Sequence, residues 1–195
     1  MLNKPEAYWN NDLFADKSKY KIFGSDGRIM VWRKKNEEVN LKNIVGTVKY
    51  GGGGVLVWVC MSASGIGNLV FFDGIMSHAL YLNILKDNLK LSAQNLGLGN
   101  NFFYHDNDTM HTALNVRLMC LYKCPQNLKT PPQSPDLNPI EHIWRELKVR
   151  VRYHDIETKR ELKTVMMKEW MNIDAEITKK TSEIYSQTLK SCCGS

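Results

Sequence analysis

The sequence lacks the features that would place it in a membrane or mark it for export. Its 195 residues contain no apolar run of transmembrane length, and the opening stretch Met1–Pro5 does not have the pattern of a signal peptide. It also contains no low-complexity tract and no internal repeat. We therefore expect a globular protein with no membrane partner.

The five cysteines are not spaced for a zinc site. Cys120 and Cys124 are four positions apart, which suits one helix face and not a Cys-x-x-Cys knuckle. No second Cys/His pair with ligand spacing follows them. We expect reduced thiols that are buried or lie in the C-terminal tail, as in a reducing compartment.

The bulk composition allows one domain with a substantial core. A chain of 195 residues buries roughly 70% of its unfolded surface. With 43% hydrophobic and 24% charged residues, the composition is that of an ordinary globular protein. The net charge of +6 favours a polyanionic partner such as nucleic acid.

Hydrophobic patterning predicts strands followed by alternating helices and strands. Strands are expected at 12–22, 28–33 and 55–63, with Phe71-Phe72 ending a further short strand, at 101–106, and around Leu128. Helices are expected at 78–95, 111–123 and after Pro139, and 157–190 should form one long helix or two shorter ones. Five leucines should form the apolar face of the first of these helices: Leu80, Leu82, Leu85, Leu89 and Leu91.

Two acids stand where the end of a strand and the start of a helix can bring them together. Asp106 ends the apolar run 101–106, and Glu141 lies one turn into a helix that Asp136 or Asn138 can cap. Between Asp106 and Glu141 lie 34 residues. Carboxylate oxygens are the ligands that magnesium-type cations prefer.

Two further acids lie near the N-terminus. Asp16 lies in the middle of the apolar run 13–20, whereas Asp12 precedes that run.

Several motifs in order resemble the Tc/mariner transposases, the Asp-Asp-Glu family. They are Asp16 within Phe14–Tyr20, the turn Phe23–Gly27, the glycine run Gly51–Gly54 before a strand, His105–Asp108, and the stretch Ser-Pro-Asp-Leu-Asn-Pro-Ile-Glu-His-Ile-Trp from Ser134 to Trp144. The spacing between the last two acids is also that of the family. The resemblance covers almost the whole chain.

The resemblance implies a ribonuclease H-like α/β fold with a mixed central sheet flanked by helices. Residues 1–10 would be a linker stub and residues 11–195 the catalytic domain. The resemblance makes Asp16 the first acid of the triad, with Asp12 as the competing candidate. Asp16, Asp106 and Glu141 would hold two Mg²⁺ (or Mn²⁺) ions and catalyse DNA strand cleavage and strand transfer. The family's activity also implies a nuclear location, although the basic stretch Lys148–Arg152 is too short and interrupted for a targeting signal.

The helix after Pro139 should carry an apolar stripe with a charged stripe beside it. The apolar stripe comprises Ile140, Ile143, Trp144, Leu147 and Val151, and the charged one comprises Glu141, Arg145, Lys148 and Arg152. The basic members could contact DNA phosphates or form a solvated helix face. His111 is a further expected DNA contact, although Thr109 and Met110 replace the family's Pro-Lys before it.

Two acids near these motifs keep alternative roles. Asp108 could act beside the metal ligands or cap a turn or helix, and Asp136 could cap the helix or bind metal directly. The glycines 51–54 do not form a nucleotide loop, because no Gly-Lys-Ser/Thr ending follows and a strand comes next. By resemblance, the segment 33–54 would reach a partner subunit in a homodimer, and a plain flexible hairpin is the alternative.

Some positions depart from the family pattern. Lys17 replaces a glutamate, Val59 a glycine and Thr130 a tryptophan, and the sequence contains no paired helix-turn-helix modules. We therefore expect a truncated or decaying copy whose acidic triad is intact. The alternative is a catalytically silent, transposon-derived nucleic-acid-binding protein. A general ribonuclease H-type nuclease or integrase is a third candidate, against which Ser-Pro-Asp-Leu-Asn-Pro argues.

Overall fold

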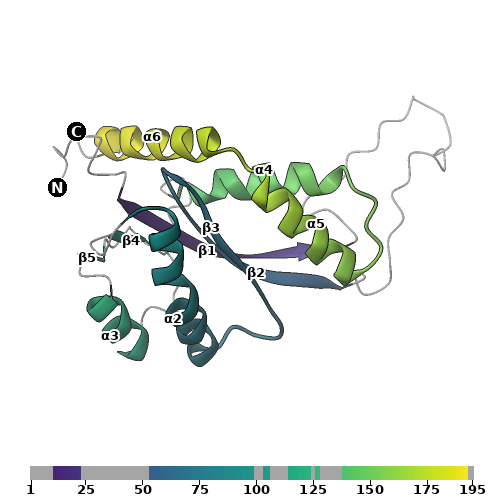
Figure 1. Ribbon diagram of the computed structural model, residues 1–195, viewed down its shortest axis with the longest axis horizontal. Helices are drawn as coiled ribbons and strands as arrows, with labels where there is room; N and C mark the ends of the chain where they lie inside the picture. Colours follow the sequence, from purple (N-terminus) through teal and green to yellow (C-terminus); the bar gives the residue numbers. More distant parts are fainter. Residues whose placement is uncertain are drawn as a thin grey trace, which may run out of the picture.

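A mixed five-stranded sheet forms the centre of the molecule. The computed structural model describes residues 11–22, 53–98, 103–105, 114–123, 126–127 and 138–192. The strands are β1 (Asp12–Lys21), β2 (Gly54–Ser62), β3 (Gly65–Phe72), β4 (Phe103–His105) and β5 (Gln126–Asn127), in the order β3-β2-β1-β4-β5. The strands β3, β2 and β1 run antiparallel, whereas β4 and β5 run parallel to β1. Figure 1 shows this sheet between two groups of helices.

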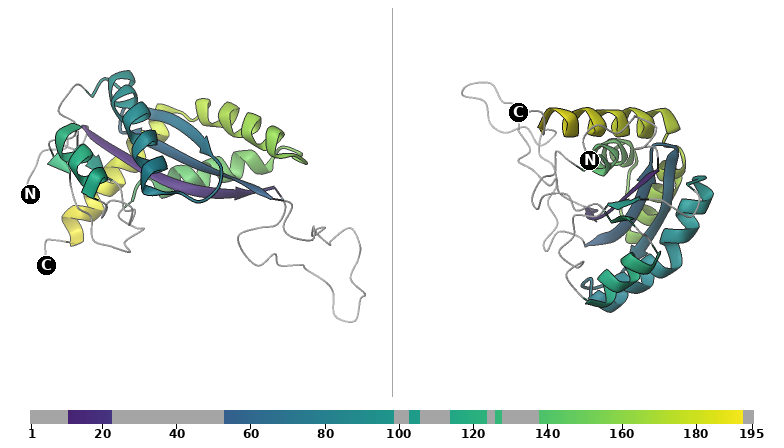
Figure 2. Two further views of the ribbon diagram at one scale, coloured as in Figure 1. Left: turned by 90° about the horizontal axis from the view of Figure 1, so that it is seen from below. Right: turned by 90° about the vertical axis from the view of Figure 1, so that its left-hand side faces the viewer.

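The helices cover both faces of the sheet. On one face lie α2 (His78–Asn95) and α3 (Leu114–Lys123), and on the other lie α4 (Ile140–Arg152), α5 (Lys159–Met171) and α6 (Ala175–Cys192). The right-hand view of Figure 2 separates the two layers. Within the described residues, no helix combines the length and apolar character that a membrane crossing requires.

Two hydrophobic cores result, one on each side of the sheet. Because side chains alternate along a strand, Phe14 of β1 packs in the core under α4–α6, whereas Leu13 and Ala15 pack in the core under α2 and α3. The same alternation puts Val59 and Cys60 of β2 in opposite cores. Burial on both faces explains why β2 reads as a continuous apolar run.

Most of the predicted elements are confirmed. β1 and β2 match the expected strands 12–22 and 55–63, and Phe71-Phe72 ends β3. The helix 78–95 is α2, β4 lies within 101–106, α3 lies within 111–123, and β5 lies just before Leu128. Of the two alternatives for 157–190, the pair of shorter helices, α5 and α6, is correct. The expected strand 28–33 lies outside the described residues.

The predicted apolar face of α2 is partly wrong. Leu91 is 49% exposed, because at 3.6 residues per turn it points about 200° away from the buried Leu89. Leu85 and Leu89 are buried as expected, and Leu80 and Leu82 are partly buried. The buried face also includes residues that a count of leucines misses: Tyr81, Ile84, Ser92 and Ala93.

The two cysteines that the structure describes in detail are free and buried. Cys60 lies in the core under α2, and this burial raises the pKa of its thiol to about 11. Cys120 is likewise a buried thiol in α3. Both therefore agree with the expectation of buried, reduced thiols.

The start of α4 is capped from the segment before it. The Asn138 side-chain Oδ1 accepts a hydrogen bond of 3.3 Å from the backbone N–H of Ile140, so Asn138 is one of the caps foreseen, while Asp136 lies outside the described residues. Pro139 follows at the helix entry, where its missing N–H has no cost. All five members of the predicted apolar stripe are buried: Ile140, Ile143, Trp144, Leu147 and Val151.

Truncating a buried side chain of the α4 apolar stripe should destabilise the fold. Leu147 is fully buried, so Leu147→Ala should lower the free energy of unfolding by about 2–5 kcal/mol. Leu118 of α3 is 53% exposed, and Leu118→Ala, the matched control, should change it by less than about 0.5 kcal/mol. Urea unfolding followed by circular dichroism measures both. An equal loss in the two variants would contradict the packing of α4 on the sheet.

Candidate active site

Asp16 lies in the middle of β1 and its side chain faces α4. It pairs with Val59 of β2 and is partly buried. The indole N–H of Trp144, on α4, donates a hydrogen bond of 2.9 Å to the Asp16 Oδ2 atom. This bond connects two residues that are 128 positions apart in the sequence.

Glu141 belongs to the same helix as Trp144, one turn nearer its start. Residues three apart on a helix lie on one side, with Cβ atoms roughly 5–6 Å from each other. Glu141 is exposed and lies in the first turn of α4. The helix therefore carries Glu141 on the side from which Trp144 reaches Asp16.

The neighbouring parallel strand leads to the remaining acid. In the register of β1 and β4, Phe14 pairs with His105. Phe14 lies two residues before Asp16 on β1. Asp106 is the next residue of the chain after His105, and it lies outside the described residues, as do His111 and Asp108. Among the residues that are described, no group of three His, Cys, Asp or Glu side chains is placed to hold a metal ion. The described acids of the expected triad are thus Asp16 and Glu141.

Asp12, the other acid of β1, has a different environment. Its side chain is fully buried at the start of the strand. The pKa of the Tyr185 hydroxyl, on α6, is raised first by burial and then by the negative charge of Asp12. Asp12 therefore belongs to the core beneath α6, and Asp16 is the β1 acid that shares a surface with α4.

A second bond joins β1 to α4. The Tyr20 hydroxyl donates to the backbone carbonyl of Trp144 at 3.3 Å, and the two rings are 5.9 Å apart. The Lys148 Nζ atom lies 5.8 Å from the centre of the Tyr20 ring. Both Asp16 and Tyr20 therefore hold α4 through Trp144.

A groove of about 500 Å³ runs along the exposed side of α4. Its described lining contains all four residues of the predicted charged stripe, Glu141, Arg145, Lys148 and Arg152, together with His142, Trp144 and Val149. The prediction that these four charged residues lie on one surface of the helix is therefore confirmed. The sequence reasoning did not single out His142, although its spacing of three from Arg145 is a signal that would have found it.

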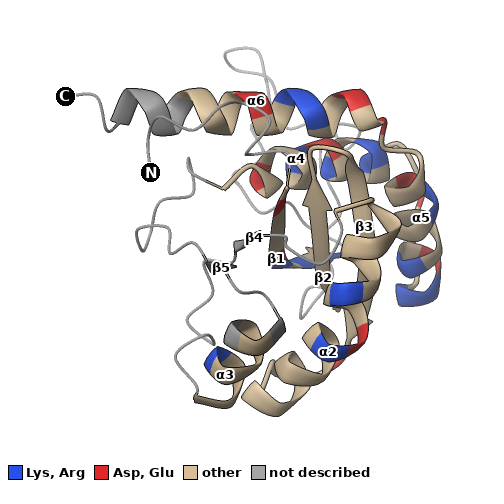
Figure 3. Ribbon diagram, turned by 60° about the vertical axis from the view of Figure 1, so that its left-hand side comes forward, with Lys and Arg blue, Asp and Glu red and all other residues tan. Residues whose placement is uncertain are grey.

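The basic residues of α4 divide into two groups. Arg150 donates to Glu146 at 2.7 Å and to the backbone carbonyl of Asn172 at 3.0 Å, so it ties α4 to the end of α5. Arg145, Lys148 and Arg152 line the groove instead. Figure 3 shows acidic and basic positions close together along the α4 ribbon. The three basic side chains in the groove are suited to contact a phosphate backbone.

Sequence comparison matches the chain to one family. The profile described as "DDE superfamily endonuclease" matches residues 14–163. The chain is 41% identical over 144 residues to the Tc1 transposase of Caenorhabditis elegans, covering 73% of this chain and 52% of that protein. It is 37% identical over 145 residues to the Tcb2 transposase of Caenorhabditis briggsae, covering 74% and 53%. The chain thus spans about half the length of the curated relatives it matches.

Solved structures match the fold. The chain superposes on the Mos1 mariner paired-end complex with Mn with a TM-score of 0.78 at 16% identity, covering 94% of this chain and 55% of that one. For the Mos1 transposase catalytic domain the TM-score is 0.71 at 15% identity, with 96% and 83% covered. The expected ribonuclease H-like fold with a mixed sheet is therefore confirmed.

Removing the Tyr20 hydroxyl should loosen α4 from β1. Tyr20→Phe keeps the ring and deletes the bond to the Trp144 carbonyl, so the free energy of unfolding should fall by about 1 kcal/mol. Tyr153 is 84% exposed, and Tyr153→Phe should leave stability unchanged within about 0.5 kcal/mol. Guanidinium unfolding compares the two. If Tyr20→Phe were as stable as the wild type, this bond would contribute nothing to the docking.

Proposed function

The chain belongs to the DDE superfamily of endonucleases, and we propose that it forms the catalytic domain of a Tc/mariner-type transposase. Its activity would be DNA strand cleavage and strand transfer, the steps of cut-and-paste transposition and integration. The observation that carries this proposal is the bond from Trp144 to Asp16, because it brings the Asp16 strand under the helix that bears Glu141. Beside them, β4 runs parallel to β1 and ends one residue before Asp106.

The proposed catalytic and metal-binding residues are Asp16, Asp106 and Glu141. Their donor atoms are carboxylate oxygens, which suit Mg²⁺ or Mn²⁺ and not softer metals. Asp16 is partly exposed and Glu141 is exposed, so both side chains are accessible to a cation. Two such ions, when bound, activate the attacking oxygen and stabilise the leaving oxygen in phosphoryl transfer. Mos1 structures with Mn and with Mg are among the structural neighbours.

The proposed DNA-binding surface is the groove along α4. Arg145, Lys148 and Arg152 follow one another by three and four residues, so they form a row roughly 10 Å long at 1.5 Å per residue. Such a row can track successive phosphates and hold a strand with its scissile bond toward Glu141. Phosphate contacts carry no base information, so we propose non-specific duplex binding by these residues.

Further parts of the proposal concern segments beyond the described residues. His111 would be an additional DNA contact, and the segment 33–54, of which only its last two residues are described, would join two copies in a homodimer. A nuclear location would follow from the DNA substrate. Residues 1–10 would form a linker and residues 11–195 the catalytic domain.

Two of the three positions that depart from the family pattern leave the described part of the site intact, and the third, Thr130, lies outside the described residues. Val59, opposite Asp16, is fully buried in the core under α4, so its extra bulk is accommodated. Lys17 is adjacent to Asp16 on β1 and therefore points to the other face of the sheet. Neither change interrupts the bond between Trp144 and Asp16.

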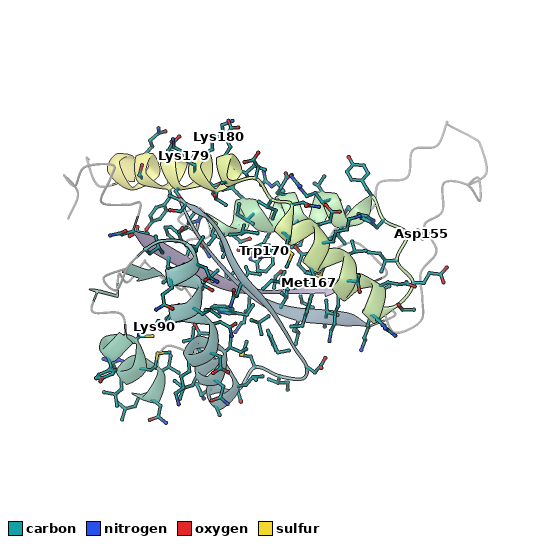
Figure 4. All side chains as sticks on the ribbon, in the orientation of Figure 1. Lys90, Asp155, Met167, Trp170, Lys179 and Lys180 are labelled. Carbon is teal, nitrogen blue, oxygen red and sulfur yellow. The ribbon has the colours of Figure 1, made fainter. Side chains whose placement is uncertain are left out.

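A nicking assay separates an enzyme from a catalytically silent DNA-binding remnant. We expect the protein to nick supercoiled plasmid with Mn²⁺, and Asp106→Asn and Glu141→Gln each to reduce the rate by at least about 10²-fold, since each removes a ligand charge. Asp155→Asn changes an exposed acid beyond the end of α4, labelled in Figure 4, and should keep the wild-type rate. Undiminished nicking by Asp106→Asn and Glu141→Gln would remove them from the site. No nicking by the wild type would favour the silent remnant.

The groove on α4 should bind duplex DNA through phosphates. Replacing Arg145, Lys148 and Arg152 with alanine should weaken binding to two unrelated duplexes equally and reduce the salt slope by about 0.9 for each lost contact. The control removes the same charge from exposed cations on the opposite side of the sheet, Lys86, Lys90 and Arg117. Fluorescence anisotropy at several salt concentrations measures both triple variants. An equal loss of DNA affinity in the two triple variants would show that binding depends on net charge and not on the groove.

A further inference from the structure

Trp144 is held more firmly than a surface-facing tryptophan would be. Its side chain is 3% exposed, and its ring centre lies 5.9 Å from that of Tyr20 and 6.4 Å from that of Trp170. The Tyr20 hydroxyl also donates to its backbone carbonyl at 3.3 Å. Ring packing and this backbone bond therefore both hold the residue whose indole N–H reaches the Asp16 Oδ2 atom.

Resting on the proposed function, we propose that Trp144 is a positioning residue for the metal site, acting through the Asp16 carboxylate. An indole N–H is only a donor and does not titrate in the working pH range, so its role as a donor to the carboxylate does not change with pH. Occupying Oδ2 fixes the rotation of the carboxylate about its last bond and so the direction of Oδ1. Partners of this kind, which orient a metal ligand without touching the metal, typically change metal affinity 10- to 100-fold.

The same bond also couples the two described acids. Trp144 and Glu141 are one turn apart on a single helix, so the indole fixes the strand acid relative to the helix acid. If the bond is removed, α4 keeps its apolar stripe but loses the contact that aligns it with Asp16. Metal binding should weaken while the fold survives.

The chain offers a matched control in Trp170. It is 2% exposed, belongs to the same aromatic group, and donates its indole N–H at 2.9 Å, but to the backbone carbonyl of Gly67 on β3. Figure 4 labels Trp170 between α5 and the sheet. Trp170→Phe therefore makes the same chemical change in the same core without altering a carboxylate.

The test is calorimetric titration of the full chain with Mn²⁺ in the absence of DNA. Trp144→Phe should bind Mn²⁺ at least about tenfold more weakly than the wild type. Trp170→Phe should bind with wild-type affinity, and Asp16→Asn should lose the site. In the nicking assay, Trp144→Phe should need more Mn²⁺ for half-maximal rate and recover most of the maximal rate at saturating Mn²⁺. If the role of Trp144 were purely structural, the Mn²⁺ needed for half-maximal rate would not rise while the maximal rate is recovered.

A second variant guards against misfolding. Trp144→3-benzothienylalanine replaces the N–H with sulfur and keeps the bicyclic shape, so it should fold and show the same weakened binding. Wild-type affinity in this variant, or an equal loss in Trp170→Phe, would overturn the positioning role while leaving the proposed function standing. Wild-type affinity in Asp16→Asn would instead remove Asp16 from the metal site, and the proposed function would fail with it.

Discussion

The docking of α4 against β1 is the contact on which the rest of the site depends. Carboxylates gathered in one place repel each other, so packing elsewhere must hold them together. The buried stripe of α4 supplies this packing, and the hydrogen bonds of Trp144 with Asp16 and Tyr20 select one orientation of the helix on the strand. Hydrophobic burial is not directional, whereas these bonds are. Burial thus fixes that α4 lies on the sheet, and the bonds fix how it lies.

The two-sided sheet gives this docking a rigid base. Alternate residues of β1 and β2 are packed in both cores, so a shift of either strand would disturb the helices on both faces. Asp16 is carried by one of these strands and is partly exposed, directly after the buried residues 12–15. A carboxylate at such a position keeps access to a cation or to DNA while its backbone has little freedom.

The sequence predicts the strands and helices well because their apolar patterns are long and regular, as for β2, α2 and the α4 stripe. It predicts less well where several helix faces compete, and Leu91 of α2 is exposed for this reason. It also indicated Asp16 and Glu141 as acids of one site. It did not indicate the bond between Trp144 and Asp16, because an apolar stripe explains a tryptophan at position 144 without any polar contact. A pairing between residues 128 positions apart has no local pattern that could reveal it.

The stability of α4 as a helix does not by itself account for the charged residues that line the groove. Glu141 in the first turn and Arg152 in the last turn are both favoured by the helix dipole. Arg145, in the middle, gains nothing from the dipole, but it stands four residues after Glu141, the spacing of a stabilising ion pair. Within the part of the chain that the structure describes, Glu146 and Arg150 form such a pair, and Glu141 and Arg145 do not. Both line the groove instead, the surface that we propose binds DNA.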